Sequence, residues 1–412
     1  PEGTHELTTS VRAGINDLIA DIAGEAGIDV EDIVEITIAG NPIMHHLFLG
    51  ISPVELGSAP FALATDEAIN FWAPELNLNV NKGARVYVLP CIAGHVGADA
   101  AAMILAEEPY RLDEISLIVD VGTNAEIVVG NKDRLLACSS PTGPAFEGAQ
   151  ISCGQRAAPG AIERVRIDPE TLDARFSVIG SELWSDDDGF EESIAAFGVT
   201  GICGSGIIEF VAELYLAGVL SEDGVIDGSL AGHSDRVIED GRTFSFLLHE
   251  GPQRIVVTHN DIRQIQLAKA ALYAGVKLLL DKAGIEKVDR IRLAGAFGSH
   301  IDTKYAMVLG LIPDCPLDKV ASAGNAAGTG ARIALLNVGA RREIEKVVRG
   351  VEKIETAIEP KFQEYFVDAM AIPNKTDAFP LLFAAVDKPA AKVVAAPGKG
   401  RRRRRKAAAK RD

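Results

Sequence analysis

The chain has few aromatic residues, few cysteines and no long hydrophobic run. Aromatic residues make up 6% of its 412 residues and glycine occurs 40 times, which favours an α/β fold with many tight turns over an all-β sandwich. The five cysteines are an odd number without CxxC spacing, so neither a disulfide framework nor a zinc or iron–sulfur site is expected from this chain alone. We therefore expect a cytoplasmic protein, and the lack of any run of about 18 apolar residues predicts no membrane span.

Charge is unevenly distributed along the sequence. The net charge is −17, but residues 388–412 carry +10, so the rest of the chain carries −27. An acidic body argues against a nucleic-acid-binding fold and suits a protein that meets small molecules or basic protein surfaces. We expect neither nucleic acid nor membrane as a partner. The arginine run 401–405 has no interleaved aromatic residues and is interpreted as part of a disordered basic tail.

Hydrophobic periodicity predicts alternating helices and strands in the first hundred residues. The expected elements are a helix over 10–26, a strand over 33–39, a helix over 43–49, a strand over 85–89 and a helix over 96–105. This alternation is typical of a partly parallel α/β sheet.

The sequence after residue 110 predicts a hairpin, followed by helices and by two short strands that end in glycine. We expect strands on both sides of a turn within 116–129, a third strand over 134–139, a polar surface insertion over 171–198, helices over 201–220 and 261–283, and short strands over 290–294 and 320–323. Asp261 is the expected N-cap of the second of these helices.

The motif Asp120-Val121-Gly122-Thr123-Asn124 lies between the first two strands of this hairpin. Gly122 lets a phosphate chain approach the backbone, and Thr123 and Asn124 add side-chain donors. Asp120 is placed to hold Mg²⁺ directly or through water, and is a candidate for both metal binding and catalysis. The alternative is an ordinary hairpin with an aspartate at its turn.

Two glycine-rich turns follow later strands. Gly295-Ala296-Phe297-Gly298 would let a flat base lie against the backbone, and Gly324-Asn325 repeats the pattern after the next strand. Either could be a plain strand-to-helix turn. A hairpin with an aspartate, then a long helix, then two glycine-ended strands resembles the order of elements in the second lobe of the sugar-kinase/heat-shock-protein/actin superfamily (ASKHA).

Four further candidates come from loops and helix starts. Asp99 could position an attacking water, or could cap a helix. Glu147 could contact the ribose or the γ-phosphate, or could be a solvated loop residue. Gly204 and Ser205 could donate N–H groups to an anion, or could simply begin a helix. His45 and His46 are interpreted as packing or surface residues, because a helical metal site favours i and i+4.

Eight ordered segments resemble the ATP-dependent reductive activators of corrinoid proteins, from about residue 10 to about residue 380. The segments are AGNPIMHHLFLGISPVELGSAPF (39–61), LPCIAGHVGADAAA (89–102), DVGTNAEIVV (120–129), SSPTGPAFEGAQISCG (139–154), ICGSGIIE (202–209), NDIRQIQLAKAAL (260–272), LAGAFGSHID (293–302) and GNAAGTGA (324–331).

The resemblance implies a two-lobed, ribonuclease-H-like ASKHA fold. Residues 1–110 would form a middle domain, which is a first lobe incomplete at its N-terminus, and residues 111–383 a second lobe with an insertion near 165–245. Residues 384–412 would form the disordered tail. Implied cofactors are ATP and Mg²⁺, with a [2Fe–2S] cluster expected only on an N-terminal domain absent from this sequence.

The implied activity is ATP-coupled, low-potential electron transfer that restores a Co(II) corrinoid to Co(I). The implied partner is a corrinoid methyl-transfer protein, and a homodimer is left open. The sequence departs from the family pattern because it has neither the N-terminal cysteine cluster nor an earlier phosphate hairpin in the first lobe. The alternatives are a small-molecule kinase on the same fold and a non-catalytic binding module derived from it.

The tail generates the first prediction. Limited trypsin digestion should remove residues 388–412 first, because ordering them would cost roughly 1–2 kcal/mol per residue with little burial in return. The remaining core should keep its thermal midpoint. Resistance of the tail, or a midpoint lowered by its removal, would identify it as a docked element.

Overall fold

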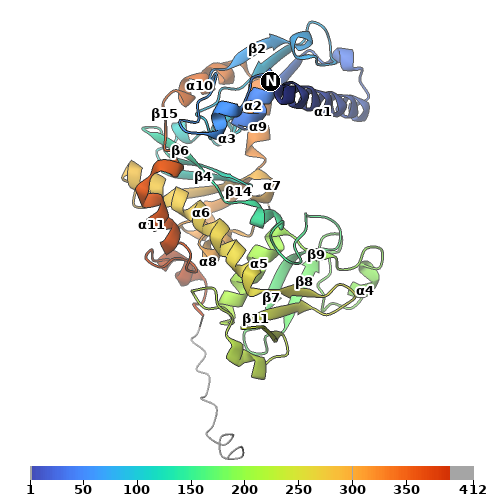
Figure 1. Ribbon diagram of the computed structural model, residues 1–412, viewed down its shortest axis with the longest axis vertical. Helices are drawn as coiled ribbons and strands as arrows, with labels where there is room; N and C mark the ends of the chain where they lie inside the picture. Colours follow the sequence, from blue (N-terminus) through green and yellow to red (C-terminus); the bar gives the residue numbers. More distant parts are fainter. Residues whose placement is uncertain (1, 299, 390–412) are drawn as a thin grey trace, which may run out of the picture.

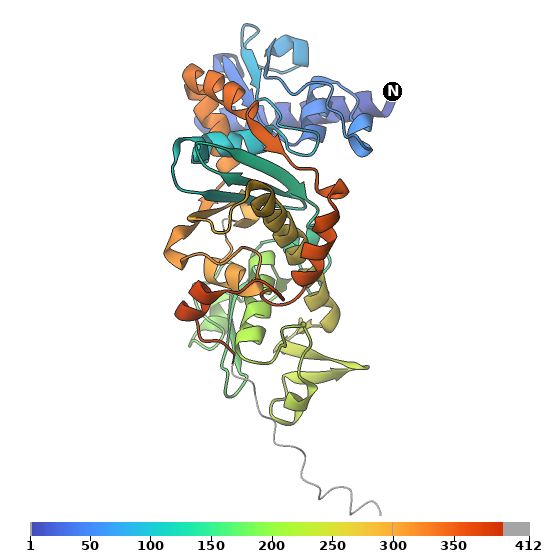
Figure 2. The ribbon, with the colours of Figure 1, turned by 90° about the vertical axis from the view of Figure 1, so that its left-hand side faces the viewer.

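The structure, a computed structural model, describes residues 2–298 and 300–389. The molecule is elongated, with the N-terminal elements at one end, a central sheet in the middle and a group of short strands at the other end (Figure 1). The view turned by 90° shows the same order along the long axis (Figure 2). Nearly all of the basic tail, from residue 390, lies outside the described residues.

The N-terminal part packs one long helix against a small sheet. Its elements are α1 (Glu2–Ala26), β1 (Glu35–Ile38), α2 (Pro42–Leu49), β2 (Ile69–Trp72), β3 (Arg85–Val88) and α3 (Ala98–Glu107). The strand order is β1-β3-β2, with β1 parallel and β2 antiparallel to β3. Helix α1 begins well before residue 10, where its apolar spacing starts, and Thr8 in this added segment is buried.

Six strands form the central sheet in the order β14-β13-β4-β5-β6-β15. They are β4 (Ser116–Val121), β5 (Ala125–Gly130), β6 (Leu135–Ser140), β13 (Arg290–Ala294), β14 (Val320–Gly324) and β15 (Val351–Lys353). Strands β4, β5 and β6 form an antiparallel meander, while β13 runs parallel to β4 and β14 parallel to β13. The predicted hairpin is therefore confirmed, and both glycine-ended strands are on the same side of β4.

Two small sheets occupy the far end of the molecule. One has the order β8-β7-β9, from β7 (Ala161–Ile167), β8 (Ala174–Val178) and β9 (Gly201–Ile202). The other has the order β10-β11-β12, from β10 (Val237–Asp240), β11 (Thr243–His249) and β12 (Ile255–Val257). The segment 171–198, expected to be a polar surface insertion, contributes β8 to the core because Phe176 and Val178 are buried.

The other helices are α4 (Phe190–Ser193), α5 (Gly204–Leu216), α6 (His259–Ala283), α7 (Gly295–Gly298), α8 (Thr303–Leu309), α9 (Ala326–Leu336), α10 (Val338–Val348), α11 (Pro360–Asp368) and α12 (Pro380–Ala385). The sequence predicted Asp261 as the N-cap of α6, and this prediction is wrong. Thr258 caps the helix, and Asp261 lies three residues on as the reciprocal partner of a capping box. The second oxygen of Asp261 is free to accept the backbone N–H of Ser152 at 2.8 Å, which fastens a distant loop to the start of α6.

Helix α6 also anchors the C-terminal segment. Tyr273 Oη donates to Asp377 Oδ2 at 2.8 Å, and Lys277 forms an ion pair with Asp377 at 2.8 Å. The fully buried Lys269 donates to the carbonyl of Pro373 at 2.7 Å, and burial lowers its pKa well below the ordinary value. These contacts hold the chain against the body up to the start of α12.

The N-terminal part and the central sheet are joined by two helices in close contact. Helices α3 and α9 pack together, and a Cβ added at Gly330 on α9 would lie 1.9 Å from the carbonyl oxygen of Ala102 on α3. One hydrophobic core runs through this contact, from Leu89 through α3 to Ile118 in the central sheet. The close approach of the two backbones therefore explains why both helices are rich in alanine.

Helix α10 adds polar contacts to the same junction. Arg341 forms an ion pair with Glu35 at 2.6 Å, and Tyr87 Oη donates to Glu345 Oε1 at 3.0 Å. Arg111, which follows α3, makes a two-pronged contact with Glu343. The junction is thus a packed apolar contact with ionic groups at its edge.

We predict that Gly330→Ala lowers the free energy of unfolding by about 1–3 kcal/mol, because the added methyl group meets a backbone carbonyl that cannot rotate away. Urea unfolding measures the change. The matched control is Gly24→Ala on α1, where an added Cβ meets nothing within 4 Å and the change should be neutral or slightly stabilising. Equal stability of the two variants would contradict the close helix contact.

Candidate functional site

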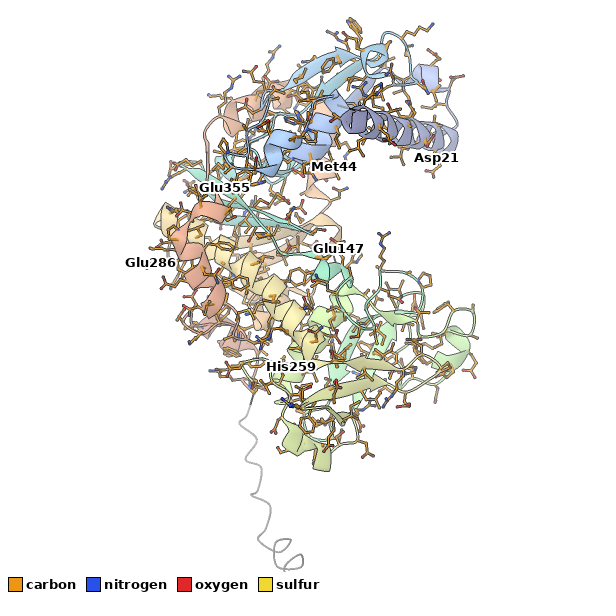
Figure 3. The ribbon with its side chains drawn as sticks, in the orientation of Figure 1. Asp21, Met44, Glu147, His259, Glu286 and Glu355 are labelled. Atoms are coloured by element: carbon orange, nitrogen blue, oxygen red, sulfur yellow. The ribbon has the colours of Figure 1, made fainter. Side chains whose placement is uncertain are left out.

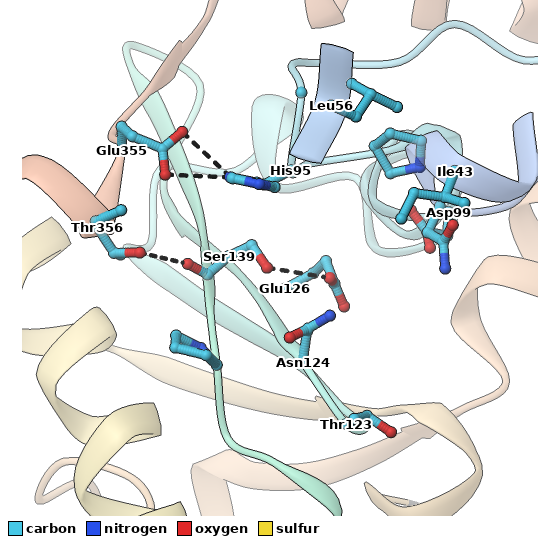
Figure 4. Close-up of a pocket in the computed structure, with 15 residues that line it drawn as sticks. Ile43, Leu56, His95, Asp99, Thr123, Asn124, Glu126, Ser139, Glu355 and Thr356 are labelled. Carbon is cyan, nitrogen blue, oxygen red and sulfur yellow. Dashed lines mark hydrogen bonds and ion pairs between the residues drawn. The ribbon is translucent and has the colours of Figure 1, made fainter. Parts of the chain in front are cut away.

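A pocket of about 520 Å³ lies between the N-terminal part and the central sheet. Fifteen residues line it: Asn41, Pro42, Ile43, Leu56, Gly94, His95, Asp99, Thr123, Asn124, Glu126, Ser139, Pro141, Glu355, Thr356 and Ala357. Figure 4 shows Ile43 and Asp99 on one side of the pocket, His95 and Glu355 on another, and Glu126 and Asn124 between them. The predicted site residues Asp99, Thr123 and Asn124 are therefore brought together.

The turn of the hairpin is held from outside by the segment after β6. Thr142 Oγ1 donates to the carbonyl of Gly122 at 2.7 Å, and the N–H of Gly143 donates to the carbonyl of Thr123 at 2.9 Å. The N–H of Gly122 donates within the turn to the carbonyl of Asn124 at 3.1 Å. The bend thus has a fixed shape in which the Gly122 N–H is already used.

Glu147 is exposed and contacts the turn of the hairpin. It ends the short 3₁₀ helix Pro144–Glu147, and its Oε1 accepts the hydroxyl of Thr123 at 2.6 Å. Figure 3 shows Glu147 at the central sheet and Met44 on the N-terminal part opposite it. The contact fixes the Thr123 side chain but commits its hydroxyl proton to Glu147.

Asp99 approaches the hairpin from the N-terminal part. The N-cap of α3 is Gly97, so Asp99 lies in the first turn, and its Oδ1 accepts the N–H of Ala100 at 2.9 Å. The N–H groups of Ala98 and Asp99 donate to the carbonyl of Gly40, at 3.0 and 3.3 Å. The start of α3 is therefore pinned to the turn that follows β1.

Three carboxylates share this region. Asp120 and Glu126 are directly opposite each other in the β4–β5 register, and Asp99 faces them from α3. Burial and the charge of Asp99 raise the pKa of Asp120 to about 6. Burial, Asp99 and Asp120 raise the pKa of Glu126 well above its ordinary value, and burial raises that of Asp99.

The first glycine turn touches the hairpin directly. Gly295 has a φ of +89°, and a Cβ added there would lie 2.3 Å from Asp120 Oδ1. Only glycine fits this position without strain, because both the backbone angle and the contact exclude a side chain. Ala296, Phe297 and Gly298 complete the short α7, of which Gly298 is buried.

The second glycine turn and the α5 turn have different surroundings. Gly324 has a φ of +60°, and Asn325 caps α9 by accepting the N–H of Gly328 at 2.8 Å. Gly204 and Ser205 begin α5, where Ser205 Oγ lies 3.3 Å from Cys203 Sγ. Neither Gly204 nor Ser205 lines the pocket, so their anion-binding role stays a prediction.

Sequence reasoning missed Glu126, His95 and Glu355. The pairing of Glu126 with Asp120 could have been found, since residues equally distant from a hairpin turn face each other. His95 Nδ1 contacts Glu355 Oε1 at 3.2 Å, and these residues are 260 positions apart with no sequence signal linking them. Although burial alone would raise the pKa of Glu355, Lys353 and His95 hold it below its ordinary value.

The histidine pair His45 and His46 is buried in α2. His46 Nε2 accepts the N–H of Ala64 at 3.0 Å, which fastens the following loop, and burial lowers the pKa of His45 to about 4. Their interpretation as packing residues fits this environment.

Within residues 2–298 and 300–389, no group of three or more His, Cys, Asp or Glu side chains is arranged to hold a metal. No helix of the same residues combines the length and apolarity that crossing a bilayer requires.

We predict that Asp120→Asn stabilises the protein above pH 6 by up to about 1–3 kcal/mol. The folded-state pKa of Asp120 is raised, so the native protein binds its proton more tightly than the unfolded chain. The wild type should therefore lose stability as the pH rises from about 4 to 6, and the variant should lose less. Thermal unfolding across this range measures the difference, and a constant offset at every pH would contradict it.

Comparison with known proteins gives matches along almost the whole described chain. The model of the RACo middle region matches residues 1–111, and the model of the C-terminal domain of RACo, the ASKHA domain, matches residues 114–383. A solved structure of a reductive activator for corrinoid, iron–sulfur protein superimposes with a TM-score of 0.77 at 34% identity, covering 91% of this chain and 58% of that one.

Two curated relatives have related names. The corrinoid activation enzyme RamQ of Eubacterium limosum is 34% identical over 379 residues, which is 89% of this chain and 61% of the relative. The [Co(II) methylated amine-specific corrinoid protein] reductase of Methanosarcina barkeri is 27% identical over 353 residues, 79% of this chain and 59% of the relative. The chain spans about three fifths of the length of these relatives. It belongs to the RACo family of reductive activators of corrinoid proteins, and it contains the middle region and the C-terminal ASKHA domain of that family.

Proposed function

We propose that this chain is the ATP-binding part of a reductive activator that returns an inactive Co(II) corrinoid protein to Co(I). The observation that carries the proposal is the contact between Asp120 and Gly295. It places the carboxylate at the end of the hairpin strand directly against a glycine turn, so that the two predicted parts of the nucleotide site are neighbours. The family membership and the corrinoid-related names of the relatives support the same activity.

ATP would lie with its phosphates at the Gly122–Asn124 turn and its base near Gly295–Gly298 and Gly324. Hard cations such as Mg²⁺ prefer carboxylate oxygens, and Asp120 and Asp99 provide such oxygens in surroundings where burial raises their pKa. The bound metal would neutralise phosphate charge. Thr123 and Glu147 would fix the shape of the turn through their hydrogen bond.

Nucleotide binding would act on the corrinoid partner through the junction of α3 and α9. Asp99 is in the first turn of α3, and Asn325 caps α9, so both ends of the ligand would bear on the same helix pair. A ligand shifts an equilibrium only by its different affinities for two states. ATP would thus change affinity for the corrinoid protein by favouring one arrangement of the two parts.

The described cysteines do not fit an iron–sulfur site. All five are unpaired, and four are buried in separate places. The electron would therefore come from a low-potential donor that this chain does not provide. Free cysteines persist in a reducing compartment, so we propose that the protein acts in the cytoplasm.

In the complete protein, Asp120→Ala should weaken Mg·ATP binding and slow Co(I) formation about a hundredfold or more. Isothermal titration measures the first effect, and the absorbance of Co(I) in a corrinoid protein supplied with a low-potential reductant measures the second. The control is Asp133→Ala, at an exposed turn between β5 and β6. Unchanged ATP affinity and unchanged Co(I) formation in Asp120→Ala would contradict the proposal.

A further inference from the structure

A second pocket, here called the α1 pocket, lies at the other end of α2 from the nucleotide pocket. It has a volume of about 420 Å³ and is lined by α1, by Gly50 at the end of α2 and by Asn77. Helices α1 and α2 pack against each other in the N-terminal part (Figure 1). The nucleotide pocket is lined instead by the start of α2, and the two pockets share no lining residue. The eight residues of α2 separate them by about 12 Å of helix.

The α1 pocket has no acidic side chain in its lining. None of its nine lining residues is Asp or Glu, and Arg12 and His5 are the lining residues that can carry a positive charge. The chain outside residues 388–412 carries a charge of −27, so a pocket of this composition differs from the rest of the protein. An anion that enters the α1 pocket meets neutral or positive groups.

Arg12 provides this pocket with a guanidinium group that no carboxylate balances. Its Nε donates to the carbonyl of Phe48 at 2.9 Å, which leaves its two terminal NH₂ groups available. In the part of the chain that the structure describes, Arg12 forms no ion pair, whereas the partly buried Arg341 pairs with Glu35 at 2.6 Å. Burial lowers the pKa of Arg12, and no neighbouring charge opposes this shift. A bound anion would supply the missing negative charge.

Thr8 contributes a second free donor. Its side chain is only 7% exposed and lines the pocket, and its Oγ1 has no hydrogen-bond partner among the described residues. A Cβ at Gly50 would lie 3.5 Å from Arg12 Nη2 and 3.9 Å from Thr8 Cγ2, so the methyl group of Thr8 lies on the Arg12 side. Rotation of χ1 by about 120° exchanges methyl and hydroxyl, and threonine in a helix adopts both rotamers. A ligand that accepts this hydroxyl would remove the cost of an unpaired buried donor.

The other polar groups of the lining hold its walls in place. Asn16 Nδ2 donates to the carbonyl of Asn77 at 2.9 Å, and Asn16 Oδ1 accepts the N–H of Asn79 at 2.8 Å. Thr9 Oγ1 donates to the carbonyl of His5 at 2.9 Å. The capacity that remains, on Arg12 and Thr8, consists of donors, so a fitting ligand must supply acceptors.

We propose that the α1 pocket binds a phosphate group, either as the free ion or as part of a small phosphorylated molecule. The guanidinium group and the hydroxyl approach from two side chains, which suits the tetrahedral oxygens of phosphate better than the two coplanar oxygens of a carboxylate. Phosphate balances the charge of Arg12 and pairs the hydroxyl of Thr8. Neither residue belongs to the proposed nucleotide site, so this proposal holds or fails independently of it.

The test is isothermal titration of the whole chain at about pH 8, without nucleotide, with inorganic phosphate, glycerol 3-phosphate and glycerol at matched ionic strength. Both phosphates should bind and glycerol should not. Tighter binding of glycerol 3-phosphate would identify a phosphorylated molecule as the ligand, and equal binding would identify the free ion. Thr8→Val and Arg12→Gln should each weaken phosphate binding about tenfold or more, because each removes hydrogen bonds to a charged group.

Thr8→Val also separates binding from a structural role, because valine keeps the volume of threonine. Without phosphate this variant should unfold at the wild-type temperature or above it, and phosphate should raise the midpoint of the wild type only. The control is Arg342→Gln, which removes an exposed arginine on α10 outside the pocket and should leave phosphate binding unchanged. Phosphate binding that persists in both Thr8→Val and Arg12→Gln would place the ion elsewhere, such as at the basic tail, and would overturn the proposal. Equal binding of glycerol and glycerol 3-phosphate would overturn it too.

Discussion

The close contact of α3 with α9 is the constraint on which the rest of the structure depends. Gly330 allows the two helices to approach until the carbonyl of Ala102 occupies the space that a side chain would need. This approach brings the start of α3, with Asp99, to the hairpin of the central sheet. A residue larger than glycine would meet that carbonyl, so the two helices would have to shift apart.

Electrostatics at the pocket follow from this packing. Asp120 and Glu126 would face each other in any hairpin with this register, but Asp99 joins them only because α3 is pinned to Gly40 and pressed against α9. Burial and Asp99 raise the pKa of Asp120, and burial, Asp99 and Asp120 raise that of Glu126, so positive charge bound here would be favourable. A metal ion bound with the nucleotide phosphates would supply that charge.

The two parts are also joined by contacts that can break. His95 and Glu355 meet across the rim of the pocket, and the α10 ion pairs lie at the edge of the junction. Such partly exposed contacts are each worth little, so they permit small movements of one part against the other. The apolar core through α3 would remain intact during such movements. This division is compatible with the proposed effect of ATP on the affinity for a partner.

The sequence by itself determined the local elements. The hairpin of Asp120 and Gly122 and the glycine-ended strands were readable because alternation, turn residues and capping act over a few neighbouring positions. The start of α1 was misplaced because the apolar spacing begins only after residue 10, while the helix also includes the buried Thr8. The cap of α6 was misassigned although the capping box of Thr258 and Asp261 is local, and only the contact of Asp261 with Ser152 depends on the tertiary structure. Only the tertiary structure brought His95 to Glu355 and Asp99 to Glu126, because these pairs depend on how whole helices pack, and no short-range pattern encodes that distance.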